Sequence, residues 1–393
     1  MTSKKGFVHM KLEEIKRRNL YRTLKKISIV KGMVIEVDGL RAINFSSNDY
    51  LGLSQHPAVL TAARVNMSQV SQCSSRLLSG SSSDIHALED KLAEHRNVSS
   101  ALVYPTGYMA NIGLLTTLAD KDSIIYSDEL NHSSIIDGCR LSGASIKVFR
   151  HNDISSLRGT IFADRHLMSK RKIIVTEGVF SMNGNIARLY EIWKIAKDSN
   201  AVTVLDDAHG DFILGHTKEH SGTADLLGVS HLIDVHVSSL SKALGSFGGY
   251  VATSHYIREL LINSSKQFIY TSAIPSHLCR AAMAAISVTT QGLRQKRLSK
   301  NINYFMEGLK KLGVATGQFA SPIIPIMIGN EVVSTQIARR LLKMGIFVQA
   351  IRYPTVRRGR AQLRVSITSE HTIEDLDFAI SCLEKVRSKA KFT

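Results

Sequence analysis

Short apolar runs alternate with amphipathic stretches through the middle of the chain. Residues 172–180 (KIIVTEGVF) predict a buried strand, 187–200 (ARLYEIWKIAKDSN) show helical spacing of apolar residues, and 201–210 (AVTVLDDAHG) predict the next strand. This order is that of two parallel strands joined by a crossover helix. Because further apolar runs follow at 231–240 and 248–254, we expect a mostly parallel sheet flanked by helices.

The two ends of the chain have a different pattern. Near the start, a charged helix precedes alternating residues in MVIEVDGLRAINF, which predict a hairpin that turns at Asp38 and Gly39. After about residue 285, helical stretches are mixed with short strand-like runs, among them 321–329, 346–352 and 362–368, and a final helix is expected over 372–386. We therefore predict three parts: an N-terminal helix and hairpin segment (1–50), a large α/β domain (51–285) and a smaller α+β domain (286–393).

Charge suggests a class of partner. The chain has 50 basic and 33 acidic residues, a formal net charge of +17. Such a balance raises the possibility of nucleic-acid binding, but much of the charge is dispersed and no recognisable nucleic-acid module surrounds it. We therefore predict no nucleic-acid partner. We favour a phosphorylated small molecule or an acidic carrier protein, which the positive electrostatic field of the chain would also attract.

Composition narrows the remaining classes. With 393 residues and 44% hydrophobic content, the chain can form a substantial core. Its four cysteines lie far apart without a CxxC pair, which predicts reduced thiols and neither a disulfide framework nor a zinc site. The chain opens without an apolar signal region and contains no run of about 18 apolar residues, so we expect no membrane span and a cytoplasmic location.

Several chemically capable side chains fall at the ends of predicted strands. Glu177, Asp206, His209 and Lys242 all lie at or just beyond such ends. In open α/β sheets, ligands bind beyond the carboxyl ends of the strands, so we expect these four residues to face one crevice. Lys242 also has unusual neighbours, because SSLSKALGSFGGYV (238–251) surrounds it with serines and glycines.

A pyridoxal phosphate site would use these residue types. A lysine amine, here Lys242, forms a Schiff base with the cofactor aldehyde, and a carboxylate, here Asp206, keeps the pyridine nitrogen protonated. The segment TGYMAN (106–111), which opens a helix, would supply a phosphate cradle at Gly107 and Tyr108. Taken singly, Asp206 could cap a turn, and His209 could be an ordinary buried histidine.

Longer motifs carry a resemblance to a known family. The chain resembles the α-oxoamine synthases, fold-type I pyridoxal phosphate enzymes that condense an amino acid with an acyl thioester and release carbon dioxide. The resemblance implies the aspartate aminotransferase-like α/β fold, with a mostly parallel central sheet and a smaller α+β C-terminal domain. The matching segments run almost end to end and include INFSSNDYLGLSQHP, SSRLLSGSSSDIHALEDKLAEH, SDELNHSSIIDGCRLSG, VTEGVFSMNGNIARL, VLDDAHG, SSLSKALGSFGGYV, FIYTSAIPSH and AIRYPTVRRGRAQLRVSITSEHT.

The resemblance also implies roles for individual residues. His132 would stack on the cofactor ring, although it could instead cap a helix, and Ser181 and His209 would contact the region of the phenolic oxygen. Ser239 would bind the phosphate, helped by Thr271 and Ser272 from the second subunit of a homodimer with shared sites. The residues expected to bind cofactor are Lys242, Gly107, Tyr108, His132, Glu177, Ser181, Asp206, His209, Ser239, Thr271 and Ser272. Asn48 and Arg364 would hold the amino-acid carboxylate, and Thr355 is a further expected substrate contact.

Within the family, DDAHG, VTEGVFSMNG and AIRYPTV are most similar to members that join L-alanine to a pimeloyl thioester in biotin biosynthesis. The chain departs from these members at Tyr353 and Arg357, where prolines are usual, and in SQCSSRLLSG, which lacks glycines common before the arginine. Both segments are expected to lie near the acyl substrate. The thiol that carries the acyl group is expected to be coenzyme A or a carrier protein. Two alternatives stay open: an α-oxoamine synthase with another amino acid or acyl chain, and a non-catalytic basic binding protein on the same fold.

Overall fold

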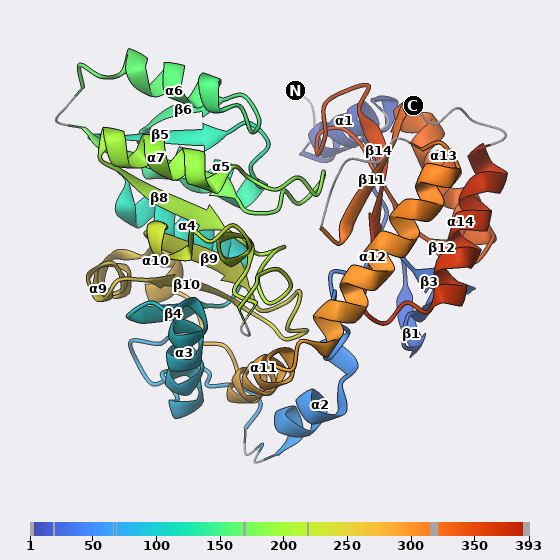
Figure 1. Cartoon of the computed structure of the whole chain (residues 1–393), viewed down its shortest axis with the longest axis horizontal. Coiled ribbons are helices and arrows are strands. Elements are labelled where there is room, and N and C mark those ends of the chain that lie inside the picture. The colour runs from blue at the N-terminus through green and yellow to red at the C-terminus, as the bar shows by residue number, and fades with distance from the viewer. Residues whose placement is uncertain are drawn as a thin grey trace. The chain divides into compact units, whose positions relative to one another are not determined.

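The structure of the protein is a computed structural model that describes residues 4–18, 20–65, 67, 69–167, 170–217, 220–314 and 321–387. The chain forms two compact units (Figure 1). One contains the described residues of 48–299 together with 321–322, and the other contains those of 1–47, 300–318 and 323–393. The N-terminal segment therefore belongs to the same unit as the C-terminal part of the chain. The domain boundaries expected at residues 50 and 285 stay a prediction.

A seven-stranded sheet forms the centre of the 48–299 unit. Its strand order is β4-β10-β9-β8-β7-β5-β6. The five adjacent strands β9, β8, β7, β5 and β6 all pair in parallel, whereas β10 runs antiparallel to both of its neighbours. This confirms the mostly parallel sheet expected from the sequence. The strands are β4 (Ser100–Tyr104), β5 (Ser123–Asp128), β6 (Ser145–Phe149), β7 (Arg171–Glu177), β8 (Ala201–Asp206), β9 (Val235–Ser239) and β10 (Gly249–Thr253).

Alternate residues of the central strands pack into two apolar cores, one on each face of the sheet. On β7, Ile173 and Val175 enter one core, whereas Ile174 enters the other. On β8, Val204 and Leu205 divide in the same way. Because successive side chains of a strand point to opposite faces, a strand covered on both sides must be apolar at nearly every position. This explains why the sequence shows continuous apolar runs here.

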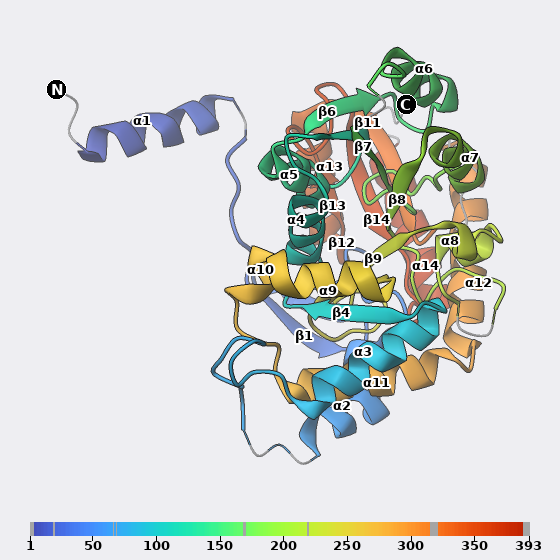
Figure 2. The same ribbon diagram turned by 90° about the vertical axis from the view of Figure 1, so that its left-hand side faces the viewer.

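Helices cover both faces of this sheet. The helix α4 contacts β9 and β10 and also packs against α5, α9 and α10; Figure 2 shows α4, α9 and α10 together on one side. The helix α7 packs on β7 and β8. The helical elements are η1 (Leu53–Gln55), α2 (Pro57–Arg64), α3 (Ser83–Arg96), α4 (Gly107–Leu118), α5 (Ser133–Ser142), α6 (Ile154–Ala163), α7 (Leu189–Ser199), α8 (Thr223–Leu226), η2 (Ser230–Leu232), α9 (His255–Ser264), α10 (Lys266–Ile269), α11 (Ser276–Thr289) and α12 (Leu293–Lys311), which continues into the other unit.

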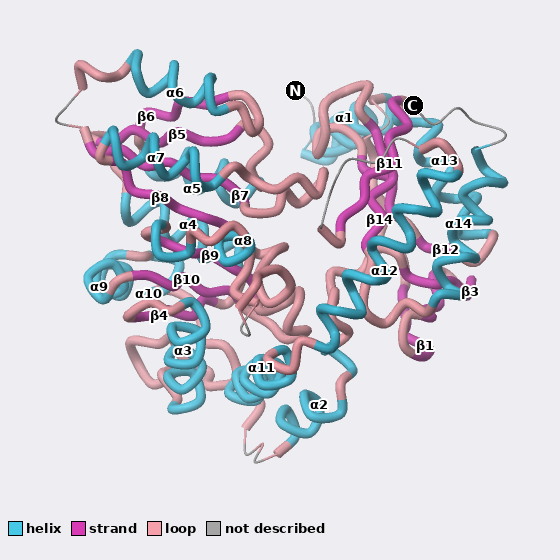
Figure 3. Tube along the Cα trace, viewed as in Figure 1, coloured by secondary structure: helices cyan, strands magenta, loops and turns pink. Residues whose placement is uncertain are grey.

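The other unit contains two smaller sheets (Figure 3). One has the order β1-β2-β3-β12 and the other has the antiparallel order β11-β14-β13. The strand β12 pairs in parallel with β3, which joins the N-terminal segment to the C-terminal part. The elements are α1 (Lys4–Arg17), β1 (Ile27–Lys31), β2 (Val34–Val37), β3 (Leu40–Asn44), β11 (Ile323–Gly329), α13 (Glu331–Lys343), β12 (Ile346–Phe347), β13 (Gln349–Ile351), β14 (Ala361–Ser366) and α14 (Ile373–Arg387).

The expected hairpin is confirmed, because β2 and β3 pair antiparallel around Asp38 (φ 50°) and Gly39 (φ 86°). Some expected strands are too long. The run at 201–210 ends as a strand at Asp206, since the N–H groups of Gly210 and Asp211 donate to the carbonyl of Asp207 and turn the chain. The run at 346–352 divides into β12 and β13, which belong to different sheets.

Candidate functional site

A cavity of about 220 Å³ opens at the carboxyl ends of β7, β8 and β9. Glu177, Asp206, His209 and Lys242, which the sequence predicts to face one crevice, all line it. The N-terminus of α4 and the start of α5 complete the wall. The other lining residues are Thr106, Gly107, Tyr108, Asn111, His132, Ser134, Ala208, Val237, Ser238, Ser239 and Ser241.

The loop that carries Lys242 is held close to the rest of the unit. The N–H of Gly245 donates to the carbonyl of Lys242 at 3.0 Å, which closes a turn. Gly245 has a φ of 60°, and a Cβ there would overlap the backbone of Ser54. Glycine is therefore required both by the left-handed backbone and by the close approach. The small neighbours of Lys242 allow this turn to pack tightly while its half-buried side chain lines the cavity.

The side chain of Asp206, at the end of β8, is fixed by hydrogen bonds to both of its oxygens. Its Oδ2 accepts a hydrogen bond from Asn111 Nδ2 at 2.6 Å, and its Oδ1 accepts one from the N–H of Ala208 at 3.1 Å. Each oxygen therefore has a donor while the residue still lines the cavity. The two oxygens are thereby fixed in position, so Asp206 is suited to accept a hydrogen bond from a protonated nitrogen of a bound molecule.

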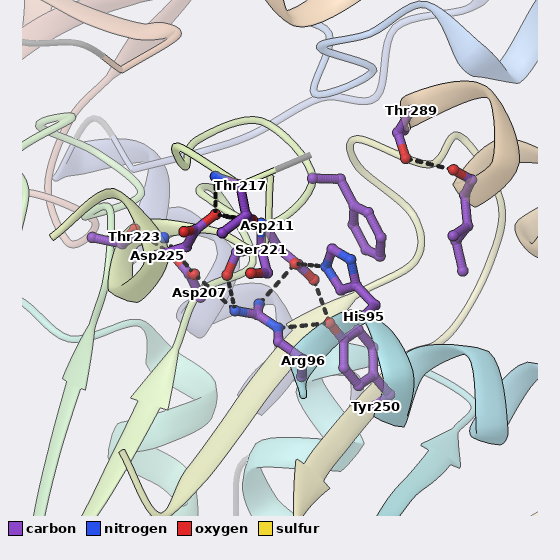
Figure 4. A network of polar contacts seen from close by, with 12 residues as sticks. His95, Arg96, Asp207, Asp211, Thr217, Ser221, Thr223, Asp225, Tyr250 and Thr289 are labelled. Carbon is purple, nitrogen blue, oxygen red and sulfur yellow. Dashed lines mark hydrogen bonds and ion pairs between the residues drawn. The ribbon is translucent and has the colours of Figure 1, made fainter. Parts of the chain in front are cut away.

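Asp207 belongs to a separate buried network (Figure 4). Arg96 Nη1 lies 3.3 Å from Asp207 Oδ2, and Arg96 Nη2 lies 2.8 Å from Asp211 Oδ1. Thr223 donates to Asp207 through both its N–H (2.8 Å) and its hydroxyl (2.6 Å), and the Tyr250 hydroxyl donates to Asp211. Burial raises the pKa of Asp207 to about 6. The two neighbouring aspartates therefore serve different environments, and only Asp206 lines the cavity.

A larger cavity of about 600 Å³ borders this network. Its buried charged residues are already paired within the protein: His95 and Arg96 contact Asp211, and Asp225 accepts hydrogen bonds from Thr217 and from the N–H of Ser221. Arg96 Nη2 has no hydrogen-bond partner among the described residues, but it lies in an ion pair 2.8 Å from Asp211 Oδ1. By contrast, three buried polar atoms of residues that line the smaller cavity have neither a hydrogen bond nor an ion pair among the described residues: Asn111 Oδ1, Glu177 Oε1 and Ser238 Oγ. Unpartnered buried polar atoms point to a ligand, so the smaller cavity is the candidate site.

The start of α4 provides an anion-binding surface. Thr106 caps this helix, because its hydroxyl accepts from the N–H of Met109 at 3.1 Å. The first-turn N–H groups of a helix have no carbonyl partner within it and attract negative charge. A Cβ at Gly249 on β10 would overlap Gly107, so two glycines let strand and helix meet here. Ser239 lies next to Gly107, with its hydroxyl 2.8 Å from that of Ser241.

Two histidines enter the cavity with fixed hydrogen bonds. His132 caps α5, as one reading of the sequence allowed: its Nδ1 accepts from the N–H of Ser134 and lies 2.8 Å from the Ser134 hydroxyl. Burial lowers the pKa of His132. Because Asn111 donates to Ser134 Oγ at 2.9 Å, the Ser134 hydroxyl is available to donate to His132 Nδ1. The proton of the neutral ring is then on Nε2.

His209 is positioned by a tyrosine that the sequence analysis did not single out. Tyr50, fully buried, lies with its hydroxyl 2.7 Å from His209 Nδ1 and donates to Asn48 Oδ1 at 3.1 Å. This contact fixes the orientation of the His209 ring beside the cavity. Asn111 and Ser134 were also missed. Asn111 lies four residues after Gly107, one helical turn along α4, and this spacing could have identified it.

The remaining expected site residues do not line the cavity. Ser181 lies next to it, because its N–H donates to Glu177 Oε2 at 3.0 Å. Thr271 and Ser272 line a separate small cavity beside Arg76 and do not line the candidate site. Arg364 and Thr355 belong to the other unit. Buried Arg364, on β14, donates to Ser366 Oγ at 2.8 Å, and Thr355 Oγ1 accepts from Arg22 at 3.4 Å.

In the part of the chain that the structure describes, no group of three or more histidine, cysteine, aspartate or glutamate side chains could hold a metal ion. In the same residues, every helix is too short or too polar to cross a membrane.

The profile of the family described as aminotransferase class I and II matches residues 41–383. The chain therefore belongs to this family, and it is a pyridoxal phosphate-dependent enzyme of the α-oxoamine synthase type. It is 39% identical over 385 residues to the 8-amino-7-oxononanoate synthase of Thermoanaerobacter pseudethanolicus, which covers 97% of this chain and 96% of the relative. It is 36% identical over 389 residues to 8-amino-7-oxononanoate synthase 1 of Bacillus subtilis, covering 98% of each.

Solved structures agree with this assignment. A serine palmitoyltransferase from S. paucimobilis, with a pyridoxal phosphate–myriocin adduct bound, has a TM-score of 0.91 and 27% identity and covers 99% of this chain and 98% of its own. The 8-amino-7-oxononanoate synthase of Francisella tularensis has a TM-score of 0.74 and 27% identity, covering 88% and 98%. The fold-type I architecture expected from the sequence is confirmed.

The residues of the cavity fit pyridoxal phosphate. The site combines a lysine amine, a carboxylate with both oxygens hydrogen-bonded, and a helix N-terminus with two serines beside it. These are the donor types that the cofactor's aldehyde, pyridine nitrogen and phosphate require. The unpartnered polar atoms of Asn111, Glu177 and Ser238 are consistent with a polar molecule in the cavity.

Proposed function

We propose that the chain joins L-alanine to a pimeloyl thioester and releases carbon dioxide and the thiol, giving 8-amino-7-oxononanoate for biotin biosynthesis. The full-length similarity to synthases of that name supports the choice of substrates. The observation that carries the chemistry is the presence of Lys242, Asp206 and the α4 N-terminus around one cavity. Bound pyridoxal phosphate would take up the electron pair left when a bond at the α-carbon of the amino acid breaks.

The residues of the chain would prepare and carry out the proton transfers. The N–H groups at the start of α4, with Ser239, would hold the phosphate, and His132 would pack against the ring. Asp206 would keep the pyridine nitrogen protonated. Lys242, once released from the cofactor, would remove the α-proton of alanine. Asn48 and Arg364 would orient the alanine carboxylate, as the family resemblance implies, so that the bond to be broken is aligned with the ring.

A substrate survey tests this proposal. The protein is loaded with pyridoxal phosphate, and alanine, glycine and serine are each combined with several acyl thioesters while released thiol and carbon dioxide are measured. We expect alanine with a pimeloyl thioester to give the highest kcat/KM. A preference for another pair would identify a different α-oxoamine synthase, and no thiol release with any pair would favour the non-catalytic binding protein. Matched coenzyme A and carrier-protein thioesters distinguish the two thiol carriers.

Asp206→Asn should keep part of the cofactor affinity but lower the condensation rate by about a hundredfold. The amide has the same shape but cannot stabilise a protonated pyridine nitrogen. Turnover and cofactor affinity are measured for this variant and for Asp198→Asn, an exposed control on α7. Turnover close to that of the unchanged protein would assign the pyridine nitrogen to another carboxyl group.

We further propose a homodimer in which Thr271 and Ser272 reach the phosphate in the neighbouring subunit. Their position outside the cavity lining of their own chain agrees with this, as does the exposure of Ser272. We expect a chain with Lys242→Ala to be inactive alone, and a chain with Thr271→Ala and Ser272→Ala to be inactive as well. If sites are shared, mixing the two variant chains in equal amounts should restore about a quarter of the activity. Half of the dimers then contain one chain of each kind, and one of the two sites in such a dimer is intact. No recovery after verified subunit exchange would contradict shared sites.

The positive charge should assist an acidic thiol carrier. Arg357, Arg358 and Arg360 are exposed on the loop that precedes β14. Changing all three to glutamine should lower kcat/KM for the acyl thioester and flatten its dependence on salt, because screened charges steer ligands less. Alanine binding, followed by the cofactor spectrum, should not change. The matched control replaces Lys296, Arg297 and Lys300 on α12 and removes the same charge; equal effects from both sets would contradict a role for this loop.

A further inference from the structure

Two carboxyl groups lie on neighbouring strand ends and line the candidate site. Glu177 ends β7 and Asp206 ends β8, and the two residues are direct partners in the parallel register. Both line the cavity and both are buried, with 2% and 7% of their surface exposed. Two carboxylates so close together in a buried site repel each other, so ionisation of one disfavours ionisation of the other.

The hydrogen bonds distinguish the two groups. Asp206 has a donor on each oxygen, from Asn111 and from the N–H of Ala208. Glu177 receives its hydrogen bonds from Ser181: the Ser181 N–H donates to Oε2 at 3.0 Å and the Ser181 side chain also hydrogen-bonds to the carboxyl group, whereas Oε1 has no hydrogen-bond partner among the described residues. A buried carboxylate oxygen without a donor is costly, whereas a proton on that oxygen removes the charge and creates a donor. The hydrogen bonds therefore favour the anion at Asp206 and the neutral acid at Glu177.

Burial and the neighbouring charges together also favour the neutral acid at Glu177. Burial, and then the charge of Asp206, raise the pKa of Glu177 to about 8, while the hydrogen bonds from the Ser181 N–H and side chain and the charge of Lys242 act against this shift. The other titratable groups that line the cavity are His132, at the start of α5, His209, just beyond β8, and Tyr108 on α4, whose hydrogen bond to Asp137 raises its pKa and keeps it neutral. Burial lowers the pKa of His132, which makes it a poor source of compensating positive charge at neutral pH.

We propose that Glu177 is the neutral, proton-bearing member of this pair and that its Oε1–H donates a hydrogen bond to an oxygen of the bound cofactor. The site then presents one negative carboxylate, Asp206, to the pyridine nitrogen. If both Glu177 and Asp206 were ionised, Lys242 would lie beside two negative charges. With Glu177 neutral, only the charge of Asp206 remains, and a smaller negative charge nearby makes an amine easier to deprotonate for use as a base. This inference deepens the proposed function, since it concerns the same cofactor site.

The protonation state is tested by infrared difference spectroscopy on the full-length protein, before and after addition of pyridoxal phosphate. Near pH 7, subtracting the spectrum of Glu177→Gln from that of the unchanged protein should leave the carbonyl stretch of a carboxylic acid, which shifts to lower frequency in D2O. Glu191→Gln is the control, because Glu191 is ionised beside Arg188 and its loss should leave that band in place. A difference spectrum that contains only carboxylate bands would overturn the proposal.

The donor role is tested by cofactor affinity. Glutamine keeps a neutral side chain with an N–H donor, whereas leucine of similar size has none. We expect Glu177→Leu to bind pyridoxal phosphate about tenfold more weakly than Glu177→Gln. Equal weakening in both variants would mean that the negative charge, not the donor, is what binds. Neither measurement uses an acyl thioester, so an error in the proposed substrates would leave both results interpretable.

Discussion

Replacing Lys242 with alanine is expected to leave a folded protein that cannot attach pyridoxal phosphate covalently. Lys242 lies in a turn, is half-buried and belongs to neither apolar core of the sheet. Its loss should therefore have little effect on unfolding. The condensation rate should fall by on the order of 10⁴-fold, because the variant lacks the amine that both carries the cofactor and moves the α-proton.

Three measurements distinguish this outcome from a simple loss of structure. Borohydride treatment followed by mass spectrometry should add the cofactor to the unchanged protein but not to Lys242→Ala. Urea unfolding should be similar for both. Lys194→Ala on α7 serves as the control, because this side chain lies beside Tyr190 on the surface of the helix. Cofactor attached to Lys242→Ala in normal yield would show that a different lysine is the attachment point.

The local pattern predicted the elements around the site well. The β7-α7-β8 unit could be recognised because the pattern of apolar residues changes from continuous, to helical, and back to continuous between Arg171 and Asp206. Both faces of this sheet are covered, so its strands had to be apolar throughout. The strand β1 was not predicted: three of its five residues are apolar, but the run is short and all five are exposed, so it is no buried strand of the kind that the apolar pattern identifies.

The connections within the site could be predicted only in part. Strand ends brought Glu177, Asp206 and Lys242 together by a general rule for parallel sheets. The contact of Tyr50 with His209 joins residues 159 positions apart, and no local pattern encodes it. Likewise, Asp206 and Asp207 are the same residue type at adjacent positions, so the sequence alone does not distinguish their roles. They differ only because the chain turns after β8 and directs Asp207 to Arg96.

Arg96→Met is expected to have the largest effect on stability, lowering the free energy of unfolding by about 3–5 kcal/mol. Arg96 is buried, with 1% of its side chain exposed, and it is the arginine between Asp207 and Asp211. Methionine fills a similar volume but leaves both carboxylates buried without this cation. Arg188→Met is the control: its pair with Glu191 is exposed, so its loss should cost only about 0–1 kcal/mol. Urea unfolding measures both.

The cost of Arg96→Met should also depend on pH. Burial opposes ionisation of Asp211, but Arg96 and His95 outweigh it and hold its pKa well below the ordinary value, so this residue makes the unchanged protein less stable as pH falls. Without Arg96, the buried carboxyl groups should have pKa values above those of the unfolded chain. Such groups stabilise the fold at low pH and lose that effect as pH rises through the folded pKa.

The difference in stability between the two proteins should therefore be greatest near neutral pH and should narrow toward pH 5. Adding Asp211→Asn to Arg96→Met should recover part of the loss, because the double variant no longer buries the charge of Asp211 without its arginine. Unfolding of the single and double variants at the two pH values gives this coupling directly. A cost that is the same at both pH values and is not reduced in the double variant would mean that Arg96 stabilises the fold by packing, and that its charge contributes little.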